Sequence, residues 1–480
     1  MHLPPTFSRF GAALVILLSS ACGSAQPDFL AGAKPIVAAP PDPAVARALE
    51  TIQPANIEQT IKALVGFGTR NTLSSMETDL PPGQGINAAA DWVAAQFERI
   101  AQKCGGCLEV HRDTFTEPAA GRIPQPTTIT NIYAILRGLD PSQAKRMVLV
   151  TGHYDSRITN VMDARGAAPG ANDDASGVAV SLECARALSK LHLPSTVVFV
   201  AVAGEEQGLN GSSHLAKLAH SEGWQLEAVL NNDIVGGNTT PGDTLQLKDR
   251  VRVFSEGVPT AATPEQARRM RTLGEENDSP SRELARAIAD TARTYFPAES
   301  GAAFAPVLVF RPDRYLRGGD HTSFNREGFA AIRFTEWRED FNHQHQNIVM
   351  PAAGSSDPIL GDLIQFVDFN YVANVARLNA ATLATLASSP GQPANVTIVA
   401  KNLDNGTTLH WDPPAGAGAG IHYELLWRET SAPDWQFSQT VSPQADGGQA
   451  TVTVPISKDN VIFAVRAVDA SGHRGLAVVP

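Results

Sequence analysis

Five short motifs place histidine and carboxylate side chains where they could hold metal ions. They are residues 152–156 (G-H-Y-D-S), 170–177 (G-A-N-D-D-A-S-G), 204–209 (G-E-E-Q-G-L), 231–233 (N-N-D) and 342–346 (N-H-Q-H-Q). Imidazole nitrogens and carboxylate oxygens are typical ligands of zinc. Each motif alone has a structural explanation, such as a hydrogen-bonded histidine or a capped helix start. Because four of them follow predicted strands, the set favours a metal centre.

His153 comes at the end of a predicted strand, residues 147–152. Open α/β sheets place their ligand sites at the carboxyl ends of strands. A neutral imidazole there can bind a metal, and Asp155 is placed to accept a hydrogen bond from the other ring nitrogen. Asp173 stands before a predicted helix, where its carboxylate could cap the helix or bridge two cations. Asp233 adds a further carboxylate at a strand end.

Glu205 and Glu206 directly follow the apolar strand predicted at residues 196–203. Two carboxylates beside an apolar run are costly unless a positive charge meets them. A metal would supply that charge, so one glutamate could bind it while the other accepts a proton from water. The structural alternative is a solvated turn. Glu205 and Asp155 are the candidate catalytic residues.

The elements that must position these side chains alternate between helices and continuous apolar strands. Helices are predicted at residues 54–67, 86–102, 176–191, 212–219, 281–295 and 362–387, and strands at 131–136, 147–152, 196–203, 228–234, 306–310 and 330–334. Such alternation predicts an α/β fold, a three-layer sandwich with a mostly parallel central sheet. Residues 237–280 are polar and are expected to interrupt it with irregular structure.

After a spacer at 388–393 the chain changes to short alternating runs separated by turn residues. This pattern predicts a small C-terminal all-β sandwich. The placement of Trp411, of residues 423–427 and of residues 463–469 resembles a fibronectin type III module. The module has no cluster of metal-ligating residues, so we expect it to position the α/β domain or to contact a cell surface or matrix.

The beginning of the chain reads as an export signal. An apolar run at 10–18 follows Arg9, and small residues permit cleavage after Ala25, although Cys22 also offers a lipid-attachment site. No later segment is apolar for long enough to span a membrane. We therefore expect a periplasmic, extracellular or lipid-anchored protein. The expected organisation is a signal peptide (1–25), an Ala/Pro-rich linker (26–45), an α/β domain that carries the five motifs (46–390) and the β module (393–480).

The net charge argues against nucleic-acid binding, and the cysteines indicate the redox compartment of the protein. The 480 residues carry a net charge of -11, which leaves no basic surface for nucleic acid. Cys104 and Cys107 are expected to form a structural disulfide in an oxidising compartment, in preference to a redox pair or half of a zinc site. Cys184 lies in an apolar helical pattern and is expected to be a buried thiol.

The five motifs resemble, in order and spacing, the di-zinc aminopeptidases of the secreted bacterial leucyl-aminopeptidase type, which are related to glutamate carboxypeptidase and glutaminyl cyclase. The resemblance covers residues 55–387 and implies a zinc exopeptidase fold. It also implies two zinc ions, with His153 and Asp233 on one, Glu206 and a late histidine on the other, Asp173 between them and Glu205 as general base.

The resemblance leaves two questions open, namely which late histidine binds zinc and what His321 does. The family shows one late histidine, whereas this chain has His343 and His345. We choose His345, whose distance from His321 better suits the family spacing. His321 itself is expected to hold substrate or a tetrahedral oxyanion, with a buried pair to Asp320 as the alternative.

The predicted function is therefore removal of N-terminal residues from peptides or proteins by a water that the metals activate. Alternatives within the fold are a glutaminyl cyclase, or a carboxypeptidase that uses Arg311, Arg314 and Arg317 to bind a substrate carboxylate. A non-catalytic cell-surface binding protein is the alternative from another class. An intact ligand set favours hydrolysis.

Overall fold

The computed structural model describes residues 27–30, 33–298, 301, 303–401, 403–415, 420–442, 444–446 and 448–480. The expected signal peptide and Cys22 lie outside these residues, as does part of the expected linker. No helix in the described ranges is both long and apolar enough to cross a membrane.

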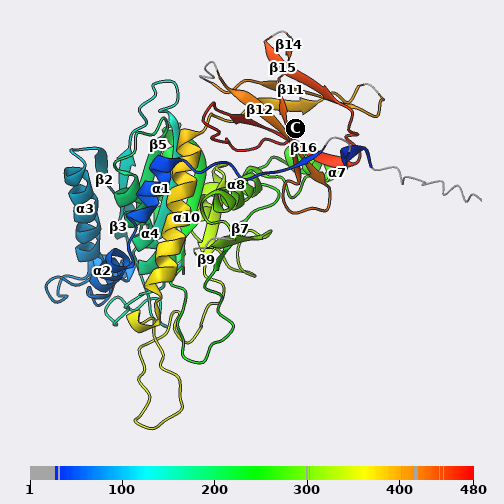
Figure 1. Ribbon diagram of the computed structural model, residues 1–480. Coiled ribbons are helices and arrows are strands. Elements are labelled where there is room, and N and C mark those ends of the chain that lie inside the picture. The colour runs from blue at the N-terminus through cyan, green and yellow to red at the C-terminus, as the bar shows by residue number, and fades with distance from the viewer. Residues whose placement is uncertain are drawn as a thin grey trace, which may run out of the picture.

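An eight-stranded mixed sheet forms the centre of the larger part of the molecule (Figure 1). Its strands, in spatial order, are β2 (Leu108–Glu117), β3 (Thr127–Leu136), β5 (Thr196–Val202), β4 (Arg146–His153), β6 (Gln225–Asn232), β9 (Ala331–Thr335), β7 (Arg250–Ser255) and β8 (Ala305–Val309). The four middle strands β5, β4, β6 and β9 run parallel. Their carboxyl ends therefore share one edge of the sheet.

Helices cover both faces of the sheet, which confirms the predicted α/β sandwich. One face carries α1 (Pro43–Glu50), α2 (Pro54–Val65), α3 (Ile86–Lys103), α4 (Ala175–Leu188), α8 (Pro280–Tyr295) and α10 (Phe369–Ser388), and the other carries α6 (Asn210–Ser221) and α9 (His321–Arg326). Strand β4 shows why both faces are filled. Val148 and Val150 lie in the hydrophobic core on the face covered by α4 and α10, whereas Met147 and Leu149 lie in the core on the face covered by α6 and α9. Side chains alternate in this way along a strand.

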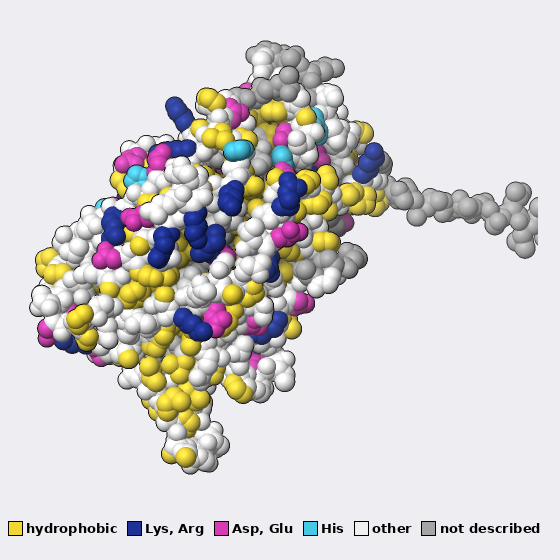
Figure 2. Space-filling model, turned by 60° about the vertical axis from the view of Figure 1, so that its left-hand side comes forward, with side chains coloured by type: hydrophobic (Ala, Val, Ile, Leu, Met, Phe, Trp, Pro, Cys, Tyr) yellow, Lys and Arg dark blue, Asp and Glu magenta, His cyan; other side chains and the backbone are white. Residues whose placement is uncertain are grey.

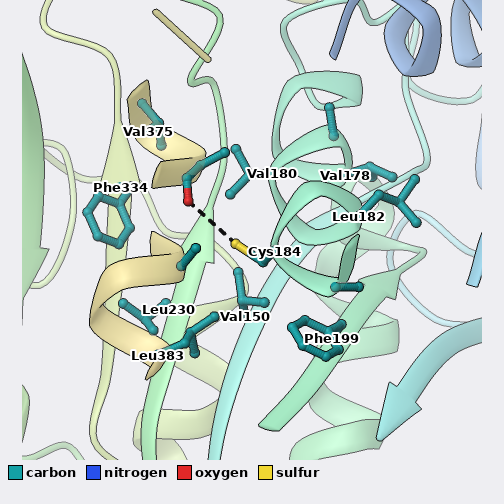
Figure 3. Packing of buried hydrophobic residues seen from close by; sticks show 14 of the residues in the cluster. Val150, Val178, Val180, Leu182, Cys184, Phe199, Leu230, Phe334, Val375 and Leu383 are labelled. Atoms are coloured by element: carbon teal, nitrogen blue, oxygen red, sulfur yellow. Dashed lines mark hydrogen bonds between the residues drawn. The ribbon is translucent and has the colours of Figure 1, made fainter. Parts of the chain in front are cut away.

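Helix α4 packs closely on β4 and α10. A Cβ atom on Gly152 would lie 2.5 Å from the carbonyl carbon of Gly177, so the strand and the start of the helix touch through their backbones. Further along, the buried thiol of Cys184 donates to the carbonyl oxygen of Ala376 in α10 at 3.6 Å (Figure 3). This packing brings the residues before α4 to the end of β4.

Two antiparallel four-stranded sheets form the C-terminal part. One contains β1 (Lys34–Pro35), β13 (Phe437–Val441), β12 (His422–Glu429) and β16 (Val461–Val468), and the other β10 (Ala394–Ile398), β11 (Thr407–Asp412), β15 (Gln449–Val454) and β14 (Gln444–Asp446). Trp411 and Trp427 lie in their shared core. Strand β1 comes from the segment expected to be a linker and pairs with β13. The described part of that segment is thus built into the C-terminal sheets.

The expectation of irregular structure at 237–280 is wrong, because β7 and α7 (Pro264–Leu273) lie in this stretch. Val251 and Val253 are buried while the arginines beside them are partly exposed, so β7 reads as polar in the sequence. Helix α7 buries no side chain and depends on its capping box. The long last helix begins at Phe369, after the Asp368 cap, and not at 362. Cys104 and Cys107 form the predicted disulfide directly after α3.

Candidate metal centre

The shared edge of the middle strands gathers the candidate side chains. His153 ends β4, Glu205 and Glu206 open the short helix α5 (Glu205–Gly208) after β5, and Asp233 follows β6. Asp173 precedes α4, and His345 comes from the loop between β9 and α10. All of them except the fully buried His153 line a cleft of about 690 Å³.

The side chains form two clusters that share Asp173. One contains His153, Asp173 and Asp233, and the other Asp173, Glu206 and His345, with the ligand atoms of each cluster within 4.8 Å of one another. Nε2 of His153 lies 3.2 Å from Oδ1 of Asp173, and Nε2 of His345 lies 2.8 Å from its Oδ2. The two oxygens of Asp173 therefore face different clusters.

Unpaired atoms at the centre show that these residues fit metal ions. Nε2 of His153 and Oε1 of Glu206 are buried without a hydrogen bond of acceptable geometry to any described residue, and each faces only another candidate ligand, Oδ1 of Asp173 at 3.2 Å and Nε2 of His345 at 3.1 Å. A buried polar atom without a partner is costly, so such atoms call for a ligand. The donors are imidazole nitrogens and carboxylate oxygens, which suit zinc.

The charges of the centre favour cation binding. Burial raises the pKa of Asp173, but His345 and His153 outweigh it and hold that pKa well below its usual range. Burial lowers the pKa of His345, yet Glu206 and Asp173 raise it to about 10. The Asp173 carboxylate is thus ionised, and metal binding at His345 requires the loss of a proton that its raised pKa retains.

Glu205 differs from its neighbours because it lies in the cleft but outside both clusters. Burial raises the pKa of its carboxyl well above the usual value, with further upward contributions from Asp233 and Glu206 and a downward one from His153. A raised pKa makes a glutamate carboxylate a stronger proton acceptor than an ordinary one. This property suits a general base.

Asp155 supports the centre without entering the cleft. Its Oδ1 lies 3.3 Å from Nδ1 of His153, and its backbone carbonyl oxygen lies 3.1 Å from the same nitrogen. Its Oδ2 accepts hydrogen bonds from the backbone N–H of Glu206 at 3.1 Å and from the Thr72 hydroxyl at 3.0 Å. Asp155 therefore orients the imidazole and the turn that carries the glutamates, as a positioning residue.

Three residues around the centre have left-handed backbone conformations. Leu209, Ile234 and His345 have φ angles of 62°, 59° and 56°. Side chains other than glycine rarely adopt this region, and the cost is greatest for a branched residue such as Ile234. Hydrogen bonds from Glu336 N and Thr335 Oγ1 to the Ile234 carbonyl oxygen hold the turn after Asp233. The backbone is strained where it turns ligands into the cleft.

Arg333 is a site residue that sequence reasoning missed. It is fully buried in β9, where its Nη2 lies 2.9 Å from Oδ1 of Asp233 and its Nη1 lies 3.3 Å from Oδ2 of Asp313. An arginine within the otherwise apolar strand A-I-R-F is the signal that could have identified it. Such a residue needs a buried carboxylate nearby.

Arg157, Gln344 and Asp362 were also missed. Arg157 contacts Glu206 through Nε at 2.9 Å and Nδ1 of His345 through Nη2 at 2.5 Å. Nε2 of Gln344 donates to Oδ2 of Asp173 at 3.2 Å, and Asp362 accepts from the Asp173 backbone N–H at 2.7 Å. Arg157 directly follows the 152–156 motif and Gln344 lies within the 342–346 motif, but nothing in the sequence marks Asp362.

His343 and His321, the other two histidines considered as site residues, lie outside the clusters. The ring of His343 stacks on Phe366 with centroids 3.6 Å apart, and its Nδ1 lies 3.8 Å from Asp340. His321 is fully buried, its Nε2 lies 2.8 Å from the Pro312 carbonyl oxygen, and it is not among the residues that line the cleft. Because α9 packs against α6 and β9, this position does not support the expected substrate contact, and its acidic neighbour is Asp313 at 3.8 Å.

Comparisons with known proteins find similarity to zinc-dependent peptidases. Residues 131–353 match the model of peptidase family M28. The chain is 45% identical over 448 residues to a probable zinc metalloprotease of Pyricularia oryzae, an alignment covering 92% of this chain and 85% of the relative. It is 43% identical over 441 residues to another from Leptosphaeria maculans, covering 92% and 97%. Both relatives are fungal, although the motifs suggested a bacterial type.

The solved structures similar to this chain are more distant. The LapA aminopeptidase of Legionella pneumophila is 20% identical, with a TM-score of 0.48 and coverage of 72% of this chain and 73% of that structure. A glutaminyl cyclase of Porphyromonas gingivalis is also 20% identical, with a TM-score of 0.45 and coverage of 69% and 97%.

Proposed function

This chain is a zinc metallopeptidase of family M28, and we propose that it acts as an aminopeptidase that removes N-terminal residues from peptides or proteins. The observation that carries the proposal is the pair of clusters sharing Asp173, with Glu205 beside them in the cleft.

Two zinc ions are proposed at this centre. His153 and Asp233 would hold one, Glu206 and His345 the other, and Asp173 would contribute one oxygen to each. The separate orientation of the two Asp173 oxygens supports this assignment. When bound, zinc lowers the pKa of water, polarises the scissile carbonyl and can bind the free α-amine of the substrate.

Glu205 is proposed as the general base. Its carboxylate would accept a proton from the attacking water and pass it to the amine that leaves when the peptide bond breaks. Its raised pKa and its place in the cleft support this role. Asp155 helps to place it, because Oδ1 of Asp155 lies 3.3 Å from the backbone nitrogen of Glu205 and accepts its hydrogen.

An assay on a panel of aminoacyl p-nitroanilides tests the proposal. We expect hydrolysis that a chelator abolishes and that added zinc restores. Glu205→Gln should keep two zinc ions per chain but lose activity by about 10²- to 10⁴-fold, the usual contribution of a general base. Glu265→Gln, at an exposed position in the first turn of α7, is the matched control.

Two outcomes would replace the proposal. Activity that survives both chelation and Glu205→Gln would exclude this mechanism. Conversion of glutaminyl peptides to cyclised products without any hydrolysis would favour a cyclase.

We also propose that the protein is exported to the periplasm or the medium. The apolar run at residues 10–18 and the Cys104–Cys107 disulfide support export, since disulfides persist in oxidising compartments. The C-terminal sheets are proposed to be a fibronectin type III-like module that contacts a cell surface or matrix. Their antiparallel arrangement around Trp411 and Trp427 supports the first part of this proposal. Cell fractionation and pull-down on isolated envelopes would test both.

A further inference from the structure

We propose that the cleft contains a subsite for a carboxylate of the substrate, formed by Arg122 and Arg317. The inference rests on the proposed peptidase function of the same cleft. It names the preferred substrates as peptides that carry a carboxylate close to the scissile bond.

The lining of the cleft holds as many arginines as carboxylates. Its lining includes four arginines, Arg122, Arg157, Arg314 and Arg317. Two of them are fully engaged by protein groups: Arg157 contacts Glu206 and His345, and Arg314 pairs with Asp313 at 3.0 Å and with Glu339 at 2.8 Å. Arg122 and Arg317 each use only one of their guanidinium nitrogens in contacts with described residues.

Arg317 keeps hydrogen-bonding capacity for a ligand. Its side chain is 32% exposed, and Nη1 lies 3.1 Å from Oε2 of Glu339. That carboxylate also pairs with Arg252 and Arg314, so one negative charge faces three guanidinium groups. Nε and Nη2 of Arg317 make no hydrogen bond to any described residue. The positive charge of Arg317 is therefore only partly offset.

Arg122 lies exposed beside the proposed zinc ligands. Its Nη1 donates to the backbone carbonyl oxygen of Glu206 at 2.8 Å, which holds the guanidinium next to the turn that carries Glu205 and Glu206. Within the described ranges it has no ion pair with a carboxylate. It is therefore a cation fixed at the reaction centre with most of its donors unused.

The charge balance of the cleft favours an anionic ligand. Its carboxylates are Asp173, Glu205, Glu206 and Asp233, and two zinc ions would carry an equal and opposite charge. Asp313 and Glu339 are shared among four arginines, so Arg317 has only a shared carboxylate partner and Arg122 has none among the described residues. A guanidinium group offers paired N–H donors that match the two oxygens of a carboxylate.

The carboxylate could come from an acidic side chain beside the scissile bond or from the C-terminus of a very short peptide. Two substrate pairs that differ in charge alone separate these sources. The first pair is glutamyl and glutaminyl p-nitroanilide, and the second is the dipeptide Leu-Ala and its amide. Arg122→Gln and Arg317→Gln are compared with wild type on both pairs.

We expect kcat/KM to favour the charged member of at least one pair. Each substitution should reduce that preference by about tenfold, the factor that follows from about 1.4 kcal/mol of binding free energy. Arg326→Gln is the matched control, because this arginine is exposed at the end of α9 and does not line the cleft. It should leave both the preference and the activity unchanged. Zinc content, measured in parallel, should be equal in all four proteins.

The outcomes distinguish the subsite from the proposed function. Hydrolysis that a chelator abolishes, but without charge preference or with a preference that survives both substitutions, overturns the subsite alone. Absence of hydrolysis contradicts the proposed function, and calorimetric titration of the zinc-loaded protein with glutamate and glutamine then decides on the subsite. Tighter binding of glutamate that Arg317→Gln removes supports it, and equal binding overturns it.

Discussion

Each proposed zinc ligand is held by a second group that does not itself bind the metal. Asp155 contacts His153, Arg333 contacts Asp233, and Arg157 contacts both Glu206 and His345. The backbone of Asp173 is fixed by Asp362. These contacts orient the ligands before a metal arrives, so we expect the supporting residues to affect zinc affinity as well as stability.

Arg333→Met should destabilise the protein and weaken zinc binding. The substitution leaves the buried carboxylates of Asp233 and Asp313 without their shared partner. Breaking a buried ion pair in this way costs about 3–5 kcal/mol in the free energy of unfolding. Zinc affinity should fall by about 10- to 100-fold. Urea unfolding and zinc titration measure the two effects, with the exposed Arg326→Met as control. Unchanged zinc affinity would argue against a supporting role.

Glu336→Gln should change how stability depends on pH. Glu336 is fully buried and accepts hydrogen bonds from Asn172 and Asn238. Burial raises the pKa of its carboxyl from 4.5 to about 8. The folded state therefore binds the proton more tightly than the unfolded state, and stability falls as pH rises from about 4.5 to about 8.

Glutamine cannot ionise, so the variant should lack this fall. Relative to wild type, it should gain about 1 kcal/mol or more in the free energy of unfolding between pH 5 and pH 9. Urea unfolding at several pH values, at a fixed zinc concentration, provides the measurement. Parallel pH profiles for the two proteins would contradict the expectation.

At the scale of elements, the loop between β9 and α10 combines a fixed base with a projecting tip. Gly361 N donates to the Asn342 carbonyl oxygen at 3.0 Å, and Val349 and Leu360 form an antiparallel bridge. Beyond the base the loop extends away from the sheet (Figure 1), and hydrophobic side chains gather on this projection (Figure 2), among them the exposed Met350. His345 belongs to the base, so its position should not depend on the tip.

Replacement of residues 351–358 by Asn-Gly should preserve the metal centre. The bridge between Val349 and Leu360 has the register that a two-residue hairpin turn can close. Zinc content per chain and hydrolysis of neutral substrates should match wild type. Asp362→Ala is the contrasting variant, because it removes the contact with the Asp173 backbone and should lower zinc content. Loss of zinc on shortening the tip would show that the projection holds His345 in place.

At the scale of the whole molecule, the C-terminal sheets are joined to the peptidase part by buried charges. Nη2 of Arg428 lies 2.6 Å from Oδ1 of Asp278, and the Trp435 indole N–H donates to Glu283 at 2.9 Å. Arg466 pairs with Asp290 of α8 at 2.9 Å. These contacts make the two parts one structural unit, so we expect them to unfold together.

Arg428→Met should therefore destabilise the entire molecule. It leaves the fully buried carboxylate of Asp278 with Arg286 alone, and breaking such a pair costs about 3–5 kcal/mol. Lys458→Met is the control, since its partner Asp404 is 58% exposed and surface pairs contribute less than about 1 kcal/mol. Calorimetric unfolding should show one transition that shifts in the Arg428 variant. Two separate transitions in wild type would contradict a single unit.

The sequence alone determined the α/β class and the elements that are locally distinctive. Strands β4 and β5 are continuous apolar runs and α4 has a clear apolar pattern, so each could be predicted without knowledge of its neighbours. The gathering of His153, Glu206 and Asp233 could be predicted too. Parallel strands end at a common edge, so residues at their carboxyl ends must lie close together.

Tertiary structure alone decided the features that depend on partners distant in the chain. Strand β7 and helix α7 are too polar to be recognised from local pattern. Strand β1 has only two residues and exists because β13 pairs with it. The contact of Arg333 with Asp233 and the burial of His321 follow from how β9 and α9 pack. The spacing of apolar residues shows which face of a helix or strand is apolar. Which other element packs against that face is decided only when the chain folds.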